Sequence, residues 1–434
     1  MANIQAPRGT QDVFGKEMTK WHALEDLVRD LCYVYGYDEI RTPQFEHTEV
    51  FKRENDSSDV VNKEMYTFID KGDRSLTLRP EATAGLIRSY VENKLYTSAD
   101  LPRKFYYIGP CFRYERPQKG RMRIHHQFGI EVVGEKSPLI DAEVIQLGVD
   151  FLARVGLKDT KVLINTLGDK ESRHAYRDAL KEHFTPSLSE LCPDCQRRYI
   201  QNPLRILDCK VDAEHPALTS APHIHFYLTP ASKTYFDTVT RILGDSGIEI
   251  EVSDRLVRGL DYYSHTVFEV VSVNKEMGSQ ATIFGGGRYD ELVEYFGGPA
   301  HSGIGFGMGI ERLLVALDAE GIDISQEETI DVYVMNMGKE VLENAYQLAA
   351  MCRMAGYRTQ LDYTGRAFKT QFKSVDRMGA KVVLMVGDNE LKEGKVALKN
   401  IATQEQVTIL IEDLVHQLDH WLDEDHVCGH DHQA

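Results

Sequence analysis

The chain has 434 residues, enough for two or three domains, and its 42 % hydrophobic and 27 % charged residues are ordinary for a globular protein. No apolar run approaches the length of a membrane span, and the first residues lack the charged-then-apolar pattern of a signal peptide. The net charge of −17 argues against indiscriminate nucleic-acid binding, and seven cysteines spread along the chain predict reduced thiols and a cytoplasmic location.

Residues 1–325 predict one domain with an insertion. A helix with apolar positions from Trp21 to Tyr35 ends at Gly36, and strand-like segments then alternate with helices as far as residue 169. The segment IRTPQFEHTEVF reads as a strand, and its Pro43 suits an edge or an interface. Residues 171–254 are more polar and rich in loops, which predicts an insertion before the strand pattern resumes.

Residues 326–422 predict a separate α/β domain. Its strand-like and helical segments alternate, which favours a mostly parallel sheet covered by helices. Residues 423–434 carry His426, Cys428, His430 and His432, and we expect a disordered tail there.

The segment Phe112–Gly134 is the most informative part of the chain. It predicts a hairpin in which Arg113 ends an apolar strand and Gln127, Gly129 and Glu131 share one face of the returning strand. From Arg103 to Arg123 there are seven Lys or Arg residues and one acid, so the hairpin is basic within an acidic protein. Its base suits a small phosphate ligand and its tip suits a nucleic acid, which indicates an enzyme that attaches something small to a polynucleotide.

Glycines at every second position mark the segment GIGFGMGIERLL. In a strand, Gly303, Gly305, Gly307 and Gly309 share one face, while Ile304, Phe306, Met308 and Ile310 point into the core. A face without side chains would let a flat ring lie on the backbone, and Arg312 in the next helix would reach a phosphate. The alternative is close packing of the sheet beneath a helix.

The segment RPEATAG brings Glu81 and Thr83 to one face together with Arg79, if the preceding strand extends that far. A carboxylate beside a hydroxyl suits an ammonium group. The alternative is that Thr83 or Glu81 satisfies the first amides of the following helix.

Two further segments offer candidate site residues. LVRGLDYYSHTVFEV places Arg258 ahead of Tyr262 and Tyr263, where the arginine could stabilise charge on a phosphate and the rings could line a pocket. FGGGRYDEL presents Tyr289 after a glycine turn, a weak signal when taken alone.

Taken together, these segments resemble the class II aminoacyl-tRNA synthetases, and among them the histidyl-tRNA synthetase family, over nearly the whole chain. Pro43 matches the first class motif, Phe112–Gly134 the second and GFGMGIERLL the third. LVRGLDYYSHTVFEV and FGGGRYDELV are typical of the histidine-specific members. The resemblance implies an α+β catalytic core with a mostly antiparallel sheet, a mainly helical insertion and a C-terminal α/β anticodon-binding domain.

The resemblance also implies roles for single residues. Arg113, Glu115 and Arg312 would bind ATP, Arg258 would lie across the α-phosphate, and Arg113 would act with it in catalysis. Histidine would be bound by Glu81, Thr83, Gln127, Glu131, Arg258, Tyr262, Tyr263 and Tyr289, with Glu131 and Tyr263 on the imidazole nitrogens. The tRNA acceptor stem would meet Arg116, Gln118, Arg121 and Arg123.

The implied activity has two steps, histidine activation by ATP and transfer of histidine to the 3′ end of tRNA(His). ATP with Mg²⁺ would be needed, the protein would be a homodimer, and no membrane and no tightly bound protein metal are expected. Cys192, Cys195 and Cys209 contain a C-x-x-C pair for which His215 or His223 could complete a zinc site, and the sequence leaves that question open.

In the last domain, four cations recur at helical spacing and could hold anticodon-loop phosphates or simply face solvent: Arg366, Lys369, Lys373 and Arg377. Two rival functions are a regulatory paralogue of ATP phosphoribosyltransferase and a tRNA-binding module with an inactive core. The presence of Arg113, Arg258 and Arg312, and of the last domain, argues against both.

Overall fold

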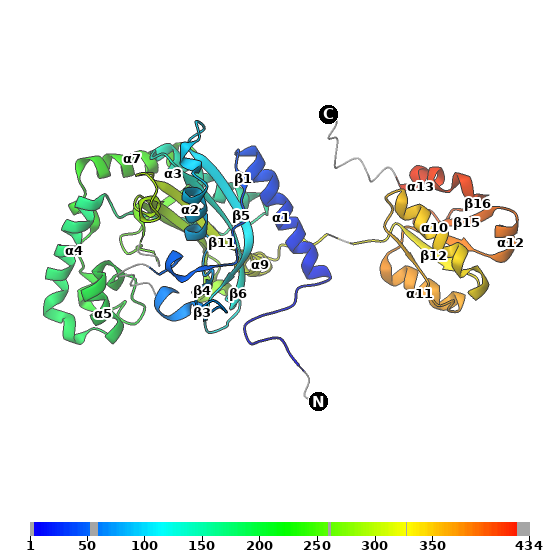
Figure 1. Ribbon diagram of the computed structural model, residues 1–434, viewed down its shortest axis with the longest axis horizontal. Helices are drawn as coiled ribbons and strands as arrows, with labels where there is room; N and C mark the ends of the chain where they lie inside the picture. Colours follow the sequence, from blue (N-terminus) through cyan, green and yellow to red (C-terminus); the bar gives the residue numbers. More distant parts are fainter. Residues whose placement is uncertain (1–3, 53–59, 259–261, 327, 423–434) are drawn as a thin grey trace. The chain divides into compact units, whose positions relative to one another are not determined.

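The computed structural model describes residues 4–52, 60–258, 262–326 and 328–422, so the predicted tail at 423–434 lies outside the described residues. The chain forms two compact units, Met1–Gln326 and Glu327–Ala434 (Figure 1). Each unit has its own hydrophobic core. Among the described residues, no helix combines the length and the apolar character needed to cross a membrane.

An eight-stranded sheet forms the centre of the first unit. In sheet order its strands are β1 (Asp38–Glu39), β5 (Arg103–Phe112), β6 (Ile124–Val133), β11 (Gly303–Gly309), β10 (Thr282–Tyr289), β9 (Ser264–Ser272), β7 (Thr160–Thr166) and β8 (Ile250–Val252). The five inner pairings are antiparallel, and only the two edge strands β1 and β8 pair in parallel. The expected mostly antiparallel core is therefore confirmed.

Helices cover both faces of this sheet. The helices of the first unit are α1 (Lys16–Val34), α2 (Thr83–Glu92), α3 (Pro138–Arg154), α4 (Lys170–Phe184), α5 (Pro193–Gln201), α6 (Pro216–Thr219), α7 (Pro230–Asp245), α8 (Leu292–Tyr295) and α9 (Ile310–Ala319). On one face, Ile304, Phe306 and Met308 of β11 pack with the apolar sides of α1, α3, α7 and α9, as the alternation in the sequence predicted. The other face, toward α2 and α4, carries the polar side chains of the site.

The segment 171–254 is mainly helical, as expected. Its N-terminal part, with α4 and α5, forms a second core over the polar face of the sheet. Its C-terminal part differs from a simple insertion, because α7 packs on α3 in the main core and β8 pairs with β7.

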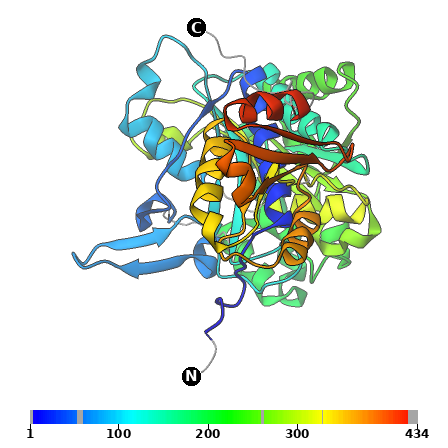
Figure 2. The same ribbon diagram turned by 90° about the vertical axis from the view of Figure 1, so that its right-hand side faces the viewer.

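A small three-stranded sheet contains β2 (Phe45–His47), β4 (Ser75–Leu78) and β3 (Tyr66–Ile69) in that order. The β3–β4 hairpin projects from the body of the first unit (Figure 2). Pro43 precedes β2 (Phe45–His47), so the predicted strand IRTPQFEHTEVF is shorter than expected and does not include the proline. Phe45, Phe68 and Ile69 on this sheet are exposed.

The second unit has a five-stranded sheet of mixed direction. Its strands, in sheet order, are β13 (Thr359–Leu361), β12 (Val332–Asn336), β14 (Val382–Val386), β15 (Lys395–Asn400) and β16 (Gln406–Leu410), and its helices are α10 (Leu342–Met354), α11 (Phe368–Met378), α12 (Asp388–Lys392) and α13 (Leu414–Leu422). Strands β13, β12 and β14 are parallel, as predicted. The prediction of a mostly parallel sheet is wrong for the rest, because short connections make β14, β15 and β16 antiparallel.

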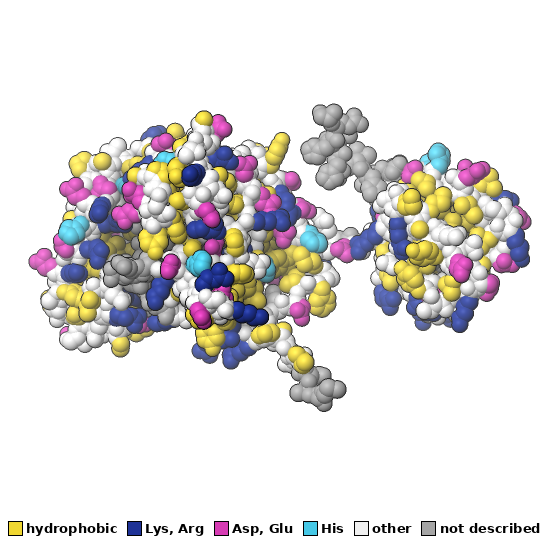
Figure 3. Space-filling view, viewed as in Figure 1, with side chains coloured by type: hydrophobic (Ala, Val, Ile, Leu, Met, Phe, Trp, Pro, Cys, Tyr) yellow, Lys and Arg dark blue, Asp and Glu magenta, His cyan; other side chains and the backbone are white. Residues whose placement is uncertain are grey.

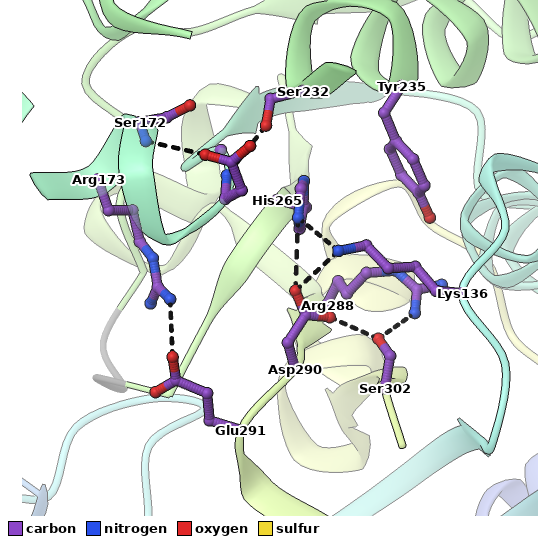
Figure 4. A network of polar contacts seen from close by, with 12 residues as sticks. Lys136, Ser172, Arg173, Ser232, Tyr235, His265, Arg288, Asp290, Glu291 and Ser302 are labelled. Atoms are coloured by element: carbon purple, nitrogen blue, oxygen red, sulfur yellow. Dashed lines mark hydrogen bonds and ion pairs between the residues drawn. The ribbon is translucent and has the colours of Figure 1, made fainter. Parts of the chain in front are cut away.

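A buried ion pair fixes β10 from behind the site. The Arg288 guanidinium and the Asp141 carboxylate of α3 are both 0 % exposed and form a salt bridge. Arg288 Nη1 also donates to Ser302 Oγ at 2.6 Å, and Ser302 Oγ donates to Asp290, which accepts from Lys136 Nζ (Figure 4). Because the neighbouring residue Tyr289 points to the other face of β10, this network sets the position of Tyr289.

Candidate active site

A cavity of about 480 Å³ opens on the polar face of the eight-stranded sheet. Its walls come from β5, β6, β10, β11, the first residues of α2 and α9, and residues 208 and 210 of the inserted segment. Arg113, Arg258 and Arg312, which are far apart in the sequence, all line it. The convergence of guanidinium groups on one cavity gives a site suited to a polyanion.

Most of the side chains predicted from sequence line this cavity: Glu81, Thr83, Arg113, Glu115, Gln118, Arg121, Gln127, Glu131, Arg258, Tyr262, Tyr263, Tyr289 and Arg312. Arg116 and Arg123 do not. Arg116 is exposed, and the Arg123 guanidinium lies over the Tyr114 ring at 4.2 Å from its centroid. The hairpin loop therefore divides its cations between the cavity and the outer surface.

Two arginines define a cationic end of the cavity. Arg113 Nε donates to the carbonyl of Pro80, and Arg312 Nη1 donates to the carbonyl of Thr282, each at 2.8 Å. Burial, together with the charges of Arg121 and Arg113, lowers the pKa of Arg312 to about 10. The part of this shift that comes from Arg121 and Arg113 shows that positive charge is concentrated here, so an anion bound there would be stabilised.

Arg258 is held in a fixed orientation. It forms an ion pair with Glu269 of β9, and its backbone has a φ of 64°. A Cβ at Gly285 of β10 would lie 2.7 Å from Arg258 Nη1, so only glycine leaves room for the guanidinium against the strand. Arg258 Nε is buried and has no hydrogen-bond partner among the described residues, which leaves a donor for a ligand.

A buried carboxyl group forms another part of the cavity wall. Glu131 is 1 % exposed and accepts hydrogen bonds from Thr83 Oγ1 at 2.5 Å and from Tyr289 Oη at 2.7 Å. Burial raises the pKa of Glu131 to about 8. A carboxyl group that titrates near neutral pH can change between accepting and donating a hydrogen bond in response to a ligand.

The glycines of β11 make room for these side chains. A Cβ at Gly305 would overlap the Glu131 carboxylate, and a Cβ at Gly303 would overlap the Tyr289 ring. From the sequence, this face was expected to stay bare for a flat ligand. That expectation needs correction for Gly303, which Tyr289 covers and which does not line the cavity, and in part for Gly305, where Glu131 lies close; Gly305, Gly307 and Gly309 all line the cavity wall.

Glu81 and Thr83 reach the cavity by a different route from the predicted one. Strand β4 ends at Leu78, so Arg79, Glu81 and Thr83 do not form a strand face. Arg79 Nε instead donates to the carbonyl of Pro110 at 2.7 Å. Glu81 accepts from the Ala84 amide at 3.0 Å, which is the helix-terminus role given as the alternative, and it still lines the cavity.

Sequence reasoning missed several residues of the wall. Glu269, the partner of Arg258, could have been found from the sequence, because a single acidic residue in the apolar run TVFEVV indicates a buried or functional carboxylate. His125 lines the cavity too, and burial together with Arg113 and Arg312 holds its pKa well below the usual range. Asp208 and Lys210 come from the insertion, and no sequence pattern indicated that this segment reaches the site.

A second cavity of about 300 Å³ shares Arg258 and Tyr263 with the first. Its other basic residues are Lys170, Arg173, Arg177 and Arg205, which come from α4 and from the segment after α5. The site therefore continues between the sheet and the inserted helices.

Comparison with known proteins agrees with this geometry. The family model described as histidyl-tRNA synthetase matches residues 9–313, and the one described as anticodon binding domain matches residues 331–421. A histidine–tRNA ligase of Bacillus licheniformis is 51 % identical over 410 residues, covering 94 % of this chain and 97 % of the relative.

Solved structures extend the comparison. The apo histidyl-tRNA synthetase of S. aureus has a TM-score of 0.82 and 41 % identity, covering 96 % of this chain and all of that chain. A Bacillus halodurans C protein described as an ATP phosphoribosyltransferase regulatory subunit/histidyl-tRNA synthetase shares the fold, with a TM-score of 0.62 and 20 % identity over 89 % of this chain and 99 % of that one. The match to the family model over residues 9–313 and the relative that is 51 % identical over 410 residues show that this chain belongs to the histidyl-tRNA synthetase family.

Proposed function

We propose that this chain charges tRNA(His) with histidine. It activates L-histidine with ATP to histidyl-adenylate and pyrophosphate, and then transfers the histidyl group to the 3′ end of the tRNA. The observation that carries the proposal is one cavity that joins Arg113, Arg258 and Arg312 to the buried Glu131 and its tyrosines.

In the activation step the histidine carboxylate attacks the α-phosphate of ATP, and the bond to pyrophosphate breaks. Two anions must approach each other, so fixed cations around the phosphates lower the barrier. Arg258 is oriented by Glu269 and Gly285, and it would stabilise the charge that develops at the α-phosphate. Arg113 and Arg312 would hold the phosphate chain.

Histidine would be selected through its ring. A neutral imidazole has one N–H donor and one acceptor nitrogen. Glu131 in its ionised form would accept from the N–H, and the hydroxyl of Tyr263 would donate to the other nitrogen. Glu81, Thr83 and Gln127 line the same cavity and would take the ammonium and carboxylate groups, with Tyr262 and Tyr289 closing the pocket.

Mg²⁺ would arrive bound to the phosphates of ATP, as this ion prefers oxygen ligands and keeps several waters. Glu115, Glu269 and Glu311 line the cavity beside the arginines. However, Glu269 pairs with Arg258 and Glu311 accepts from His126, so the ion would be held mainly by the ATP phosphates and water. The ion would neutralise part of the charge on the leaving pyrophosphate.

The tRNA would contact both units. Gln118 and Arg121 lie at the cavity, and Arg116 and Arg123 on the outer side of the same loop would meet the acceptor stem. In the second unit, Arg366, Lys369, Lys373 and Arg377 are all exposed on or beside α11. Lys and Arg side chains gather along the lower edge of this unit in Figure 3, where Figure 1 places α11, and this surface would bind the anticodon-loop phosphates.

The active form would be a cytoplasmic homodimer. The six cysteines among the described residues are free, which suits a reducing compartment. Phe45, Phe68 and Ile69 are exposed apolar residues next to the Pro43 segment, and a second copy of the chain would bury them. Light scattering should give the mass of two chains.

Histidine-dependent exchange of pyrophosphate into ATP tests the function. The purified chain should catalyse exchange with L-histidine and with no other amino acid. Absence of exchange would favour a regulatory paralogue or an inactive tRNA-binding module. If exchange occurs but tRNA(His) is not charged, the second step of the proposal is wrong.

A further inference from the structure

Four side chains with metal-binding chemistry meet in the inserted segment, away from the sheet. They are Cys192, Cys195, Cys209 and Asp212, and one ligand atom from each lies within 4.8 Å of the others. Cys192 precedes the first turn of α5 and Cys195 lies within it. Cys209 and Asp212 belong to the loop that follows residues 203–206. The fold thus brings the pair Cys192 and Cys195 close to the pair Cys209 and Asp212.

The spacing of these atoms matches a tetrahedral zinc site. Zn–S bonds of about 2.3 Å in a tetrahedron separate two sulfur ligands by about 3.8 Å, and a sulfur and a carboxylate oxygen by about 3.6 Å. Cys192 Sγ and Cys209 Sγ are 3.8 Å apart, and Cys209 Sγ and Asp212 Oδ2 are 3.7 Å apart. An ion could enter with small movements of these side chains.

Hydrogen bonds from the backbone already orient two of the ligands. The Cys192 amide donates to Asp212 Oδ2 at 3.0 Å, and the Asp212 amide donates to Cys209 Sγ at 3.4 Å. Bonds of this kind commonly fix the outer shell of a metal site. Cys195 and Cys209 are buried, at 0 % and 6 % exposure, so the ion would be shielded from water.

The histidines considered from sequence are engaged elsewhere. His215 Nδ1 accepts from the Ala217 amide at 3.2 Å, and His223 pairs with Asp254. Asp212 takes the fourth position instead. A single aspartate three residues after a cysteine is not a recognisable zinc pattern, which explains why sequence alone left the site incomplete.

We propose that Cys192, Cys195, Cys209 and Asp212 bind one Zn²⁺ ion. Three thiolates select a soft or borderline metal over Mg²⁺ or Ca²⁺, and four protein ligands leave no open position for a substrate, so the ion is structural. Binding would release the thiol protons and add to the folding free energy of the insertion.

The site lies next to the catalytic cavity along the chain. Cys209 stands between Asp208 and Lys210, and both of these residues line the cavity of about 480 Å³. A metal bond to Cys209 would hold this segment at the cavity wall. Zinc would thus couple the inserted segment to the catalytic core.

Metal analysis of the purified full-length chain tests the site directly. After dialysis against buffer without metal, mass spectrometry should find about one zinc per chain. Cys195→Ser and Cys209→Ser should reduce this to less than about a tenth, and Cys352→Ala, which removes a buried cysteine in the other unit, should leave it unchanged. Cobalt exchanged into the site should give the visible bands of tetrahedral thiolate coordination.

A replacement at Asp212 guards against variants that fail to fold. Asp212→His supplies another zinc ligand and should retain the metal, whereas Asp212→Ala should weaken its binding at least about tenfold. A chain that lacks zinc and does not take up cobalt, or that contains a Cys192–Cys209 disulfide, would overturn the proposal. The metal measurements do not depend on aminoacylation. In the pyrophosphate-exchange assay, loss of zinc with an unchanged KM for histidine would overturn the coupling to the cavity.

Discussion

Two groups of cations in this molecule are built in opposite ways. In the catalytic unit, Arg258 is 18 % exposed, is paired with Glu269 and lies against a glycine that leaves no space for another position. In the second unit, Lys369, Lys373 and Arg377 are exposed along α11, and Arg366 precedes the helix and is paired with Asp362. Arg258 is fixed before a ligand arrives, whereas the three cations on α11 have no ion-pair partner among the described residues and can adjust.

Under the proposed function, this difference corresponds to two roles, transition-state stabilisation and tRNA binding. A cation that stabilises a transition state must already be in place, because reorganisation would consume part of the stabilisation. A cation that contacts a flexible polyanion contributes through charge and counterion release, so its exact position matters little. Substitutions in the two units should therefore differ in size, in pH dependence and in salt dependence.

The largest effect on stability should come from the buried ion pair behind the site. Asp141→Ala leaves the fully buried Arg288 guanidinium without its carboxylate and should destabilise the first unit by about 3–5 kcal/mol. Urea denaturation measures this loss. The exposed Arg358–Glu328 pair of the second unit provides the control, since Arg358→Ala should cost less than about 1 kcal/mol. If the two variants lost the same free energy of unfolding, the buried pair would contribute no more to stability than the exposed pair, and the prediction would be wrong.

Arg258→Ala should give the largest effect on catalysis. The rate of pyrophosphate exchange should fall by about 10²–10³-fold, because the charge is needed most in the transition state. Histidine affinity, measured by equilibrium dialysis, should change much less.

The control for this variant is Arg103→Ala, which removes an arginine paired with Asp38 at the far end of β5. Its exchange rate should match that of the unchanged protein. If Arg258→Ala weakens histidine binding as much as it slows exchange, the arginine acts on the ground state and the proposed role is wrong.

Histidine binding should depend on pH through Glu131. Because burial raises its pKa to about 8, the carboxyl group carries a proton at lower pH and must lose it before it can accept from the imidazole. Histidine affinity should therefore rise about 15-fold between about pH 6.5 and about pH 8 and level off above about pH 9. Isothermal titration calorimetry measures the dependence.

Glu131→Gln removes the titrating group, so its weaker histidine binding should be flat over the same range. A similar pH dependence in the unchanged protein and in the variant would assign the titration to another group.

The smallest effect should come from the exposed stripe. Lys373→Ala should raise the KM for tRNA(His) by about threefold. The slope of log affinity for tRNA against log salt concentration should become smaller by about one, and the rate of pyrophosphate exchange should not change. Lys392→Ala removes an exposed cation from α12 and should leave the KM unchanged. A loss of exchange in Lys373→Ala would mean that the two units do not divide the work as proposed.

Patterns with a fixed period were readable from the sequence. The alternation in GIGFGMGIE gave the strand β11 and its buried face, and the FYYIGPCF and HQFGIEVV segments gave the β5–β6 hairpin. Local side-chain periodicity is enough for these strands. The common role of Arg113, Arg258 and Arg312, which line one cavity, is predicted by the motifs that carry the family resemblance and not by periodicity.

Features that depend on long-range packing were not readable. The sequence showed that Gly303 and Gly305 have no side chains, but not that Tyr289 and Glu131 fill the space. It favoured a strand face at Arg79, Glu81 and Thr83, where the chain turns into α2. The placement of Asp208, Lys210 and Asp212 also depends on how the insertion folds back, which no local pattern encodes.

The absence of side chains at residues 285, 303 and 305 restricts how this enzyme can evolve. Even one added methyl group would displace Arg258, Tyr289 or Glu131, although these glycines would carry no chemistry of their own. Larger side chains at these glycines could not exclude an inhibitor that binds against this wall without also displacing the site residues. Resistance substitutions would therefore have to arise on the opposite side of the cavity, in the hairpin loop or the inserted segment.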